Sequence, residues 1–276
     1  MPRAIFLKKE TSMFEGKVAI ILGASAEGGS GWEIATALAD KGARVAVAAR
    51  REAGISELAR RTGGIAIKCD AAADADVKAL VDRTISEFGR LDIAVLAAGS
   101  PVIGGICEIG DDDLERATAI NYYSLVYFLR HVAPVMADGG AVLALTSLSA
   151  TQVSPGYAAY AAAKAASQCA IRYAAIELAP RGIRVNAISP GLIESPMARA
   201  VIDIEALRHA MYKEIPLGRG VLPTEIAATA LSLVAEHSAI TGQSVVVDNG
   251  MSLRRPPFPE EIPAEAYQHG ATSAGY

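Results

Sequence analysis

Cysteine is scarce in this sequence, and so are the features of exported, membrane-spanning and disulfide-bonded proteins. Of 276 residues only 3 are cysteines, and no two of them form a C-x-x-C pair. This spacing gives neither a disulfide framework nor a zinc site. No uncharged stretch reaches the roughly 18 residues of a membrane span, and the first residues hold no apolar core of signal-peptide length. We therefore expect a cytoplasmic protein with no membrane partner.

Positive charge is also sparse. The sequence has 26 Lys and Arg residues against 30 Asp and Glu residues, a net charge of -4, and no basic run stands out. Because nucleic acid attracts basic patches, no nucleic-acid partner is expected. The 4 histidines show no metal-ligand spacing, so no metal is expected either. These exclusions leave a small soluble molecule as the expected partner.

What the sequence has in quantity is short β-rich runs that alternate with longer helical segments. The β-rich runs cover residues 17–22, 43–49, 64–68, 91–98, 141–147, 183–189 and 243–248. The helical segments cover residues 30–41, 52–61, 74–88, 111–137, 156–179 and 223–236, with a helix-rich insertion near 196–212. This alternation indicates βαβ units, and the continuous apolar runs suit strands covered on both faces. The sequence predicts an α/β fold: a single Rossmann-like, doubly wound domain with seven buried parallel strands and helices on both faces.

The two ends of the chain lie outside this pattern. We expect residues 1–13 to form a loosely ordered extension, residues 14–253 the Rossmann-fold domain and residues 254–276 a Pro-rich tail. The composition of the tail favours disorder. Phe258 and Tyr267 could instead anchor it as an arm over a neighbouring subunit or over the active-site mouth, and the sequence leaves both alternatives open.

A glycine-rich segment, "GASAEGGSG", stands between the first expected strand and the first expected helix. In that position Gly23, Gly29 and Gly31 would let the backbone approach a pyrophosphate, whose charge would lie at the N-terminus of the helix that starts near Ser30. We therefore expect a dinucleotide site, with Ser25 also in contact with the dinucleotide.

The end of the second expected strand bears on the choice of dinucleotide. An acidic residue there would bind a ribose 2′-hydroxyl and repel a 2′-phosphate. This chain has Ala49 there, followed by Arg50 and Arg51, which can offer bidentate donors to a phosphate. NADP is therefore expected rather than NAD, although two solvated arginines that open a helix would give the same pattern.

Four polar residues suggest acid-base chemistry. Tyr160 and Lys164 are four positions apart at the start of a long expected helix, and so lie on one face. An ammonium beside a phenol stabilises the phenolate and lowers its pKa from near 10. Ser147 follows a strand and could bind the same reacting oxygen, and Asn121 supplies a further polar group.

Taken together, these motifs resemble the short-chain dehydrogenases/reductases over about residues 14–253. The resemblance also rests on Asp70, "IRVNAISPG", "SPM", "PLGRG" and "TGQSVVVDNG". It implies that Tyr160 protonates the substrate oxygen, Ser147 holds that oxygen, Lys164 binds the nicotinamide ribose and lowers the pKa of Tyr160, and Asn121 positions a proton-relay water. It further implies a homotetramer or homodimer. The other residues that it places at the cofactor are Asp70, Ala98, Gly99, Pro190, Gly191, Ile193 and Ser195. Apart from the resemblance, we expect Tyr157 to form an aromatic wall of the substrate pocket and Met197, in the helix-rich insertion, to lie at the substrate.

The chain departs from the usual family pattern in its glycine loop. Five residues separate Gly23 from Gly29, two more than usual, a length that resembles the enoyl-acyl-carrier-protein reductase branch. In that branch six residues separate the tyrosine from the lysine, and Tyr157 stands at that distance from Lys164 in this chain. We favour Tyr160, because Ser147 stands where the branch carries another tyrosine and Asn121 completes the carbonyl-reducing set. The expected function is interconversion of a ketone or aldehyde with an alcohol; the alternatives are an enoyl-thioester reductase or a non-catalytic nucleotide-binding scaffold.

Overall fold

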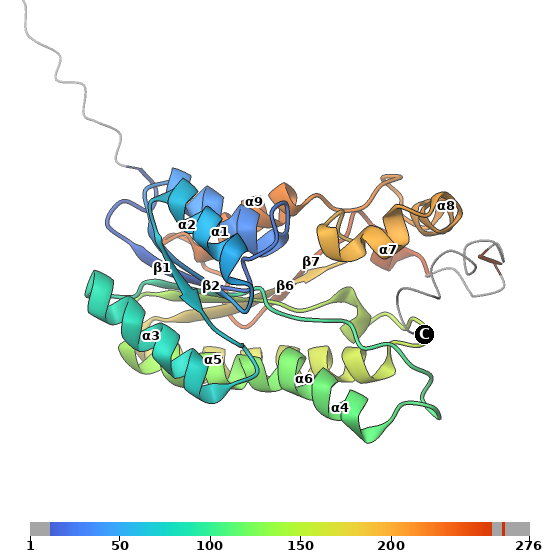
Figure 1. Ribbon diagram of the computed structural model, residues 1–276, viewed down its shortest axis with the longest axis horizontal. Helices are drawn as coiled ribbons and strands as arrows, with labels where there is room; N and C mark the ends of the chain where they lie inside the picture. Colours follow the sequence, from blue (N-terminus) through green and yellow to red (C-terminus); the bar gives the residue numbers. More distant parts are fainter. Residues whose placement is uncertain (1–11, 256–260, 263–276) are drawn as a thin grey trace, which may run out of the picture.

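The computed structural model describes residues 12–255 and 261–262, and these form a seven-stranded parallel sheet (Figure 1). The strand order is β3-β2-β1-β4-β5-β6-β7, so the predicted Rossmann-like sheet is confirmed. The strands are β1 (Val18–Leu22), β2 (Arg44–Ala49), β3 (Ile65–Lys68), β4 (Ile93–Leu96), β5 (Ala141–Leu145), β6 (Arg184–Pro190) and β7 (Ser244–Val247).

Helices cover both faces of the sheet. The described helices are α1 (Ser30–Asp40), α2 (Glu52–Thr62), α3 (Asp74–Phe88), α4 (Asp111–Thr118), α5 (Ser124–Val135), α6 (Ala158–Leu178), α7 (Arg199–Ile202), α8 (Glu205–Lys213) and α9 (Pro223–Val234). Helices α1, α2 and α9 lie on one face, and α3, α5 and α6 lie on the other (Figure 1). Alternate strand residues therefore enter two separate cores, as a two-residue strand period requires.

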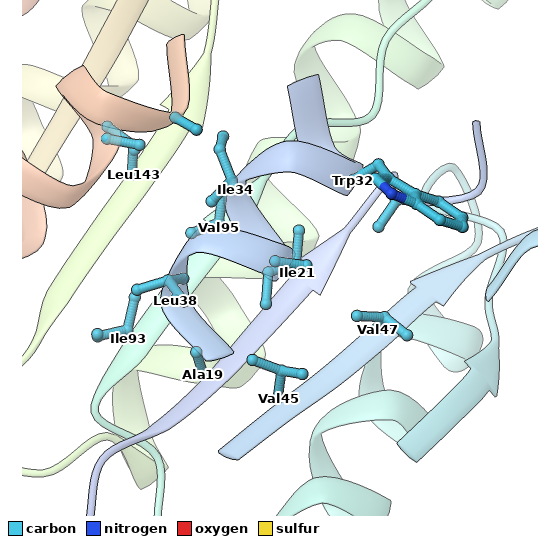
Figure 2. Packing of buried hydrophobic residues seen from close by; sticks show 14 of the residues in the cluster. Ala19, Ile21, Trp32, Ile34, Leu38, Val45, Val47, Ile93, Val95 and Leu143 are labelled. Carbon is cyan, nitrogen blue, oxygen red and sulfur yellow. The ribbon is translucent and has the colours of Figure 1, made fainter. Parts of the chain in front are cut away.

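The core under α1 shows how the sequence pattern produces this layer. Ile34 and Leu38 are four residues apart on one face of α1 and are buried against the sheet, and Trp32 lies at the start of the helix in the same core (Figure 2). They pack against residues such as Ile21 of β1 and Val47 of β2, all of which are buried. Trp32 is only 4% exposed, so it serves as a packing residue at the start of the helix.

The prediction that all seven strands are buried is wrong at the two edges of the sheet. Every residue of β1 is buried, but β3 alternates between half-buried and exposed residues, and Val246 in β7 is 46% exposed. Each edge strand has a neighbour on one side only, so less of it is covered by helices.

One long predicted helix is divided. The segment predicted as 111–137 consists of α4, a π-helical turn at Ala119–Tyr123 and α5. The turn contains Asn121, whose side-chain amide donates to the Ala117 carbonyl at 3.0 Å and so takes a carbonyl of the preceding helix. Such π turns are frequent at functional sites. The predicted insertion near 196–212 is a 3-10 turn at Pro196–Ala198 followed by α7 and α8.

The packed domain begins at Phe14. Its side chain is 2% exposed and its backbone N–H donates to the Lys41 carbonyl at 2.8 Å. Most of the predicted extension, 1–11, lies outside the described residues, as do 256–260 and 263–276 of the predicted tail, including Phe258 and Tyr267.

Candidate active site

The candidate site lies where the carboxyl ends of the central strands meet. The loops after β1 and β4 are neighbours there, because the strand order reverses between these two strands. Ligands of open α/β sheets bind at such a reversal. Gly23 follows β1, Gly99 follows β4 and Ser147 follows β5, so three predicted site residues share this edge.

The predicted catalytic residues come together beside β5. Tyr160 lies in the first turn of α6 and Lys164 one turn later, with the Lys164 Nζ 5.8 Å from the centroid of the Tyr160 ring. Lys164 is 4% exposed and its Nζ donates to the Leu145 carbonyl at 2.9 Å. Ser147 is hydrogen-bonded to Tyr160, and its Oγ also accepts from the Ser149 N–H at 3.1 Å.

Burial dominates the electrostatics of this pair. It raises the pKa of Tyr160 above its ordinary value, and the hydrogen bond with Ser147 opposes that rise. Burial also lowers the pKa of Lys164 to about 8. The reason is that an uncharged, water-poor surrounding penalises the phenolate and the ammonium alike. The lowering of the Tyr160 pKa by the Lys164 charge stays a prediction.

Asn121 braces the loop that follows β4. Its amide donates to the Ser100 carbonyl at 2.9 Å, and its Oδ1 accepts from the Ser100 N–H at 3.1 Å. A Cβ on Gly99 would lie 3.0 Å from the Lys164 Nζ and 3.1 Å from the Asn121 Oδ1. Gly99 thus lets the backbone pass directly over these two side chains, and Asn121 holds it there.

The glycine loop has the shape that a dinucleotide pyrophosphate requires. Gly23 has a φ of 105°, and a Cβ there would meet the backbone of Ala97 at 2.6 Å and collide with the Ala98 N. A Cβ on Gly31 would collide with the Gly23 carbonyl oxygen. Ser30 and Gly31 open α1 directly after Gly29, so the helix N-terminus faces this cradle. The residues present therefore fit the pyrophosphate of a nicotinamide dinucleotide.

The residues predicted at the adenosine end lie in the glycine loop or follow β2 and β3. The Arg51 Nε donates to the Ser25 Oγ at 3.2 Å, and Arg50 is exposed at the end of β2. Asp70 follows β3, where its Oδ1 accepts from the Ala72 N–H at 3.0 Å in a tight turn. The last residue of β2 is Ala49, so this position carries no acidic side chain.

The segment after β6 completes the edge of the site. Gly191 packs on Asp248, since a Cβ there would lie 2.9 Å from the Asp248 Cβ. The predicted residues of this segment are Pro190 at the end of β6, Gly191, Ile193 in a parallel bridge with Val221, Ser195 before a 3-10 turn, and Met197 in that turn. Met197 is 66% exposed, so the structure places it on the surface rather than in a closed pocket wall.

Tyr157 lies beside Tyr160. It immediately precedes α6, and its ring centroid is 6.2 Å from that of Tyr160 at an interplanar angle of 70°. This edge-to-face contact brings both candidate tyrosines to one place. The Lys164 Nζ is 5.8 Å from the centroid of the Tyr160 ring, one helical turn further along α6.

Comparison with known proteins places this geometry in a family. A family model described as Enoyl-(Acyl carrier protein) reductase matches residues 23–252. A mutant of a Serratia marcescens short-chain dehydrogenase/reductase superposes with a TM-score of 0.81 at 34% identity, covering 87% of this chain and 99% of that chain. The protein is a short-chain dehydrogenase/reductase.

Relatives of this short-chain dehydrogenase/reductase carry names of different activities. D-threitol dehydrogenase of Mycolicibacterium smegmatis is 35% identical, over 87% of this chain and 94% of its own length. 1-Cyclohexenylcarbonyl-CoA reductase of Streptomyces collinus is 33% identical, over 88% and 89%. A 7 alpha-hydroxysteroid dehydrogenase, solved with NADH and 7-oxo glycochenodeoxycholic acid, has a TM-score of 0.81 at 32% identity, over 89% and 97%.

Two contacts of this short-chain dehydrogenase/reductase were missed by sequence reasoning. The Tyr212 hydroxyl in α8 is 2.9 Å from the Glu194 Oε1, which ties the helical insertion to the segment after β6. The Gln152 amide donates to the Met251 carbonyl at 3.2 Å and to the Arg254 carbonyl, which ties the loop before Tyr157 to the C-terminal side of the domain. Each contact joins residues distant in the sequence, and no local motif marks it.

Within residues 12–255 and 261–262, no group of three or more His, Cys, Asp and Glu side chains is arranged to hold a metal ion. No helix in the same part of the chain has the length and apolar character to cross a membrane.

The burial of Lys164 leads to a pH-dependent stability. Its pKa is about 8 in the fold against 10.5 for the ordinary group, so between these values the unfolded chain binds more protons and the free energy of unfolding rises with pH. Lys164→Met lacks this titration. We therefore expect the free energy of unfolding of the wild type, relative to that of Lys164→Met, to increase by about 3 kcal/mol from pH 8 to 10.5. Urea denaturation at the two pH values measures this difference. A difference that stays constant with pH would contradict the lowered pKa of the buried Lys164 side chain.

Proposed function

We propose that this protein is an NADPH-preferring oxidoreductase that interconverts a ketone or aldehyde with an alcohol, with Tyr160 as the general acid and base. The observation that carries the proposal is the position of Tyr160 and Lys164 one turn apart in α6, with the Lys164 Nζ 5.8 Å from the centroid of the Tyr160 ring and Ser147 at the end of β5 nearby. This set is what protonation of a carbonyl oxygen requires: a proton donor, a second donor to the same oxygen, and a nearby cation.

Each residue has a separate task in this proposal. The bound nicotinamide supplies the hydride. Ser147 donates to the substrate oxygen and fixes its position, and Tyr160 delivers the proton to that oxygen. Lys164 holds the nicotinamide ribose, and its positive charge stabilises the phenolate that Tyr160 becomes. Asn121 keeps the loop after β4 in place over Lys164, so this loop serves as a fixed wall of the site.

The preference for NADPH rests on the adenosine end of the site. Ala49 ends β2 without a carboxylate that would repel a 2′-phosphate, and Arg50 and Arg51 follow it. The Ser25 hydroxyl adds a further hydrogen-bonding group next to Arg51. Relatives named as NADH-dependent enoyl reductases make NAD the alternative cofactor, so the test includes both.

Reduction of an enoyl thioester is the second candidate function. It is favoured by the names of the matching family model and of the Streptomyces collinus relative, and by Tyr157, whose ring lies 6.2 Å from that of Tyr160. We place it second, because Tyr160 lies one helical turn before Lys164 in α6, with the Lys164 Nζ 5.8 Å from its ring centroid. A non-catalytic scaffold would have no need for this four-residue set.

The proposed functional unit is a cytoplasmic homotetramer or homodimer. Exposed apolar side chains on the outer faces of α5 and α6 support subunit contact through these helices. Among them are Tyr173 and Ile176 of α6, which are 67% and 77% exposed.

Initial rates of coenzyme oxidation test the proposed function directly. Purified protein is assayed with NADPH and with NADH against aryl ketones, aliphatic ketones, a 3-ketoacyl thioester and an enoyl thioester. We expect turnover with one or more ketones and a higher kcat/KM for NADPH. Turnover with the enoyl thioester alone would overturn the carbonyl assignment, and a higher kcat/KM for NADH would overturn the role of the two arginines.

A further inference from the structure

The lengthened part of the glycine loop is held by a cation from α2. Ala26 and Glu27 form an outward turn, in which the Gly29 N–H donates to the Ala26 carbonyl at 2.9 Å. Glu27 is the only charged residue between Gly23 and Gly31, and its Oε1 accepts from the Arg61 Nη1 at 2.8 Å. The added residues thus place a carboxylate beside the dinucleotide loop and pair it with Arg61.

Besides Glu27 of the glycine loop, Arg61 contacts Trp32 of α1 and Glu57 of its own helix, α2. Its guanidinium carbon is 5.6 Å from the centroid of the Trp32 ring in α1, and its Nε is 3.5 Å from the Glu57 Oε1 in α2. A cation over the face of a tryptophan is attracted by the ring, and a buried ring cannot move away. Trp32, shown at the start of α1 in Figure 2, is 4% exposed. Arg61 is therefore held where it can pair with Glu27.

The other end of α2 contacts the same loop. A Cβ on Gly54 would collide with the Ser25 carbonyl oxygen, so the first turn of α2 packs directly on the loop backbone. The Arg51 side chain also reaches the Ser25 hydroxyl, at 3.2 Å. The loop is thus fixed to α2 at both ends of the helix, by Gly54 and Arg51 at one end and by Arg61 at the other.

The charges around this loop explain what the pairing achieves. Arg50 and Arg51 are the cations offered to a 2′-phosphate, and Glu27 lies two residues after Ser25. Unpaired, its carboxylate would repel that phosphate, since charges within about 10 Å of each other are incompletely screened. Glu52, a carboxylate at the start of α2, has Lys68 at 3.9 Å. Arg61 therefore cancels the one charge of the loop that opposes phosphate binding.

We propose that Arg61 is a specificity-determining positioning residue: by pairing with Glu27 it lets the site of Ser25, Arg50 and Arg51 accept a 2′-phosphorylated adenosine. The inference rests on the proposed NADPH preference and adds to it a residue that lies outside the expected phosphate site. Arg61 acts through Glu27 and the loop, and it needs no contact with the phosphate itself.

Binding of cofactor fragments tests this proposal without catalysis. Dissociation constants for adenosine 2′,5′-bisphosphate and adenosine 5′-monophosphate are measured by calorimetry, and also by the emission of Trp32, the single tryptophan of the chain. Arg61→Ala is expected to weaken binding of the bisphosphate by about 5-fold at low salt, because Glu27 is then unpaired, and to leave binding of the monophosphate within about 2-fold. The effect should shrink at high salt.

Two further variants separate the mechanism from simple loss of charge. Arg60→Ala removes the same charge from the preceding residue of α2. The Arg60 side chain is hydrogen-bonded to Glu57 instead of to the loop. Arg60→Ala is expected to change the ratio of the two dissociation constants by less than about 2-fold. Glu27→Gln introduced into Arg61→Ala is expected to restore tight binding of the bisphosphate, since the repelling carboxylate is gone.

The outcomes distinguish the two proposals. If Arg61→Ala behaves like Arg60→Ala, or if Glu27→Gln restores nothing, the role of Arg61 is overturned while the NADPH preference stands. If the wild-type protein binds the bisphosphate no more tightly than the monophosphate, the NADPH preference is itself overturned, and the role of Arg61 with it.

Discussion

Replacing Tyr160 by phenylalanine is expected to lower kcat for carbonyl reduction by about 1,000-fold. The change removes one hydroxyl from a residue that is bonded to Ser147 and lies over Lys164, and loss of a positioned general acid costs 100- to 10,000-fold, roughly, in enzymes. The ring and its packing remain, so the fold is retained. Steady-state rates at saturating coenzyme, together with the thermal midpoint of unfolding, measure both effects.

Tyr157→Phe is the matched control for this loss. The same hydroxyl is removed from a ring 6.2 Å away, at the position just before α6. If Tyr160 is the acid, Tyr157→Phe should change kcat for carbonyl reduction by less than about 10-fold and act mainly on KM for the substrate. A loss of about 1,000-fold in Tyr157→Phe with little change in Tyr160→Phe would exchange the two roles and favour the enoyl reductase.

Gly31→Ala is expected to damage both the fold and the dinucleotide site. Its Cβ would collide with the Gly23 carbonyl oxygen and lie 3.1 Å from the Ala97 Cβ, so α1 must move away from the glycine loop. Overpacking of this kind costs about 3 kcal/mol. Because the loop and the start of α1 form the pyrophosphate cradle, we also expect binding of NADPH to weaken by about 100-fold or more. Urea denaturation and calorimetry measure the two losses.

Gly28→Ala supplies the comparison within the same loop. Gly28 has a φ of 71°, which an alanine adopts at a cost of about 1 kcal/mol, but a Cβ there would meet nothing within 4 Å. It should therefore destabilise the protein less than Gly31→Ala and leave NADPH binding within about 5-fold, since it displaces no neighbouring group. Equal losses in the two variants would show that backbone freedom, rather than the close approach of α1, governs this loop.

The fold was predictable because its signals are local. Runs of apolar residues at strand length alternate with segments of helical period, and this pattern fixes which residues face each core. The exceptions follow from neighbours that the pattern does not contain. The edge strands β3 and β7 are less buried than predicted. The helix predicted at 111–137 is divided at Asn121, whose amide donates to the Ala117 carbonyl of α4 and to the Ser100 carbonyl.

Part of the candidate site was equally legible. Tyr160 and Lys164 share a helix face by their spacing alone, and Ser147 and Gly99 follow strands that lie side by side in a parallel sheet. The pKa values of Tyr160 and Lys164 could not be predicted from the sequence. Whether Lys164 or burial governs the pKa of Tyr160 depends on how much water the surrounding elements exclude, and this sum over the whole packed site favours burial.

By itself, then, the sequence determined the doubly wound sheet, the order of its elements and the residues offered at its carboxyl edge, because periodicity and short spacings act within one element. Only the tertiary structure decided which side chains the added loop residues contact. Glu27 meets Arg61 across 34 positions and Tyr212 meets Glu194 across 18, after separate helices have docked on the sheet. Contacts between side chains so far apart depend on the packed positions of their elements, and no spacing in the sequence encodes those positions.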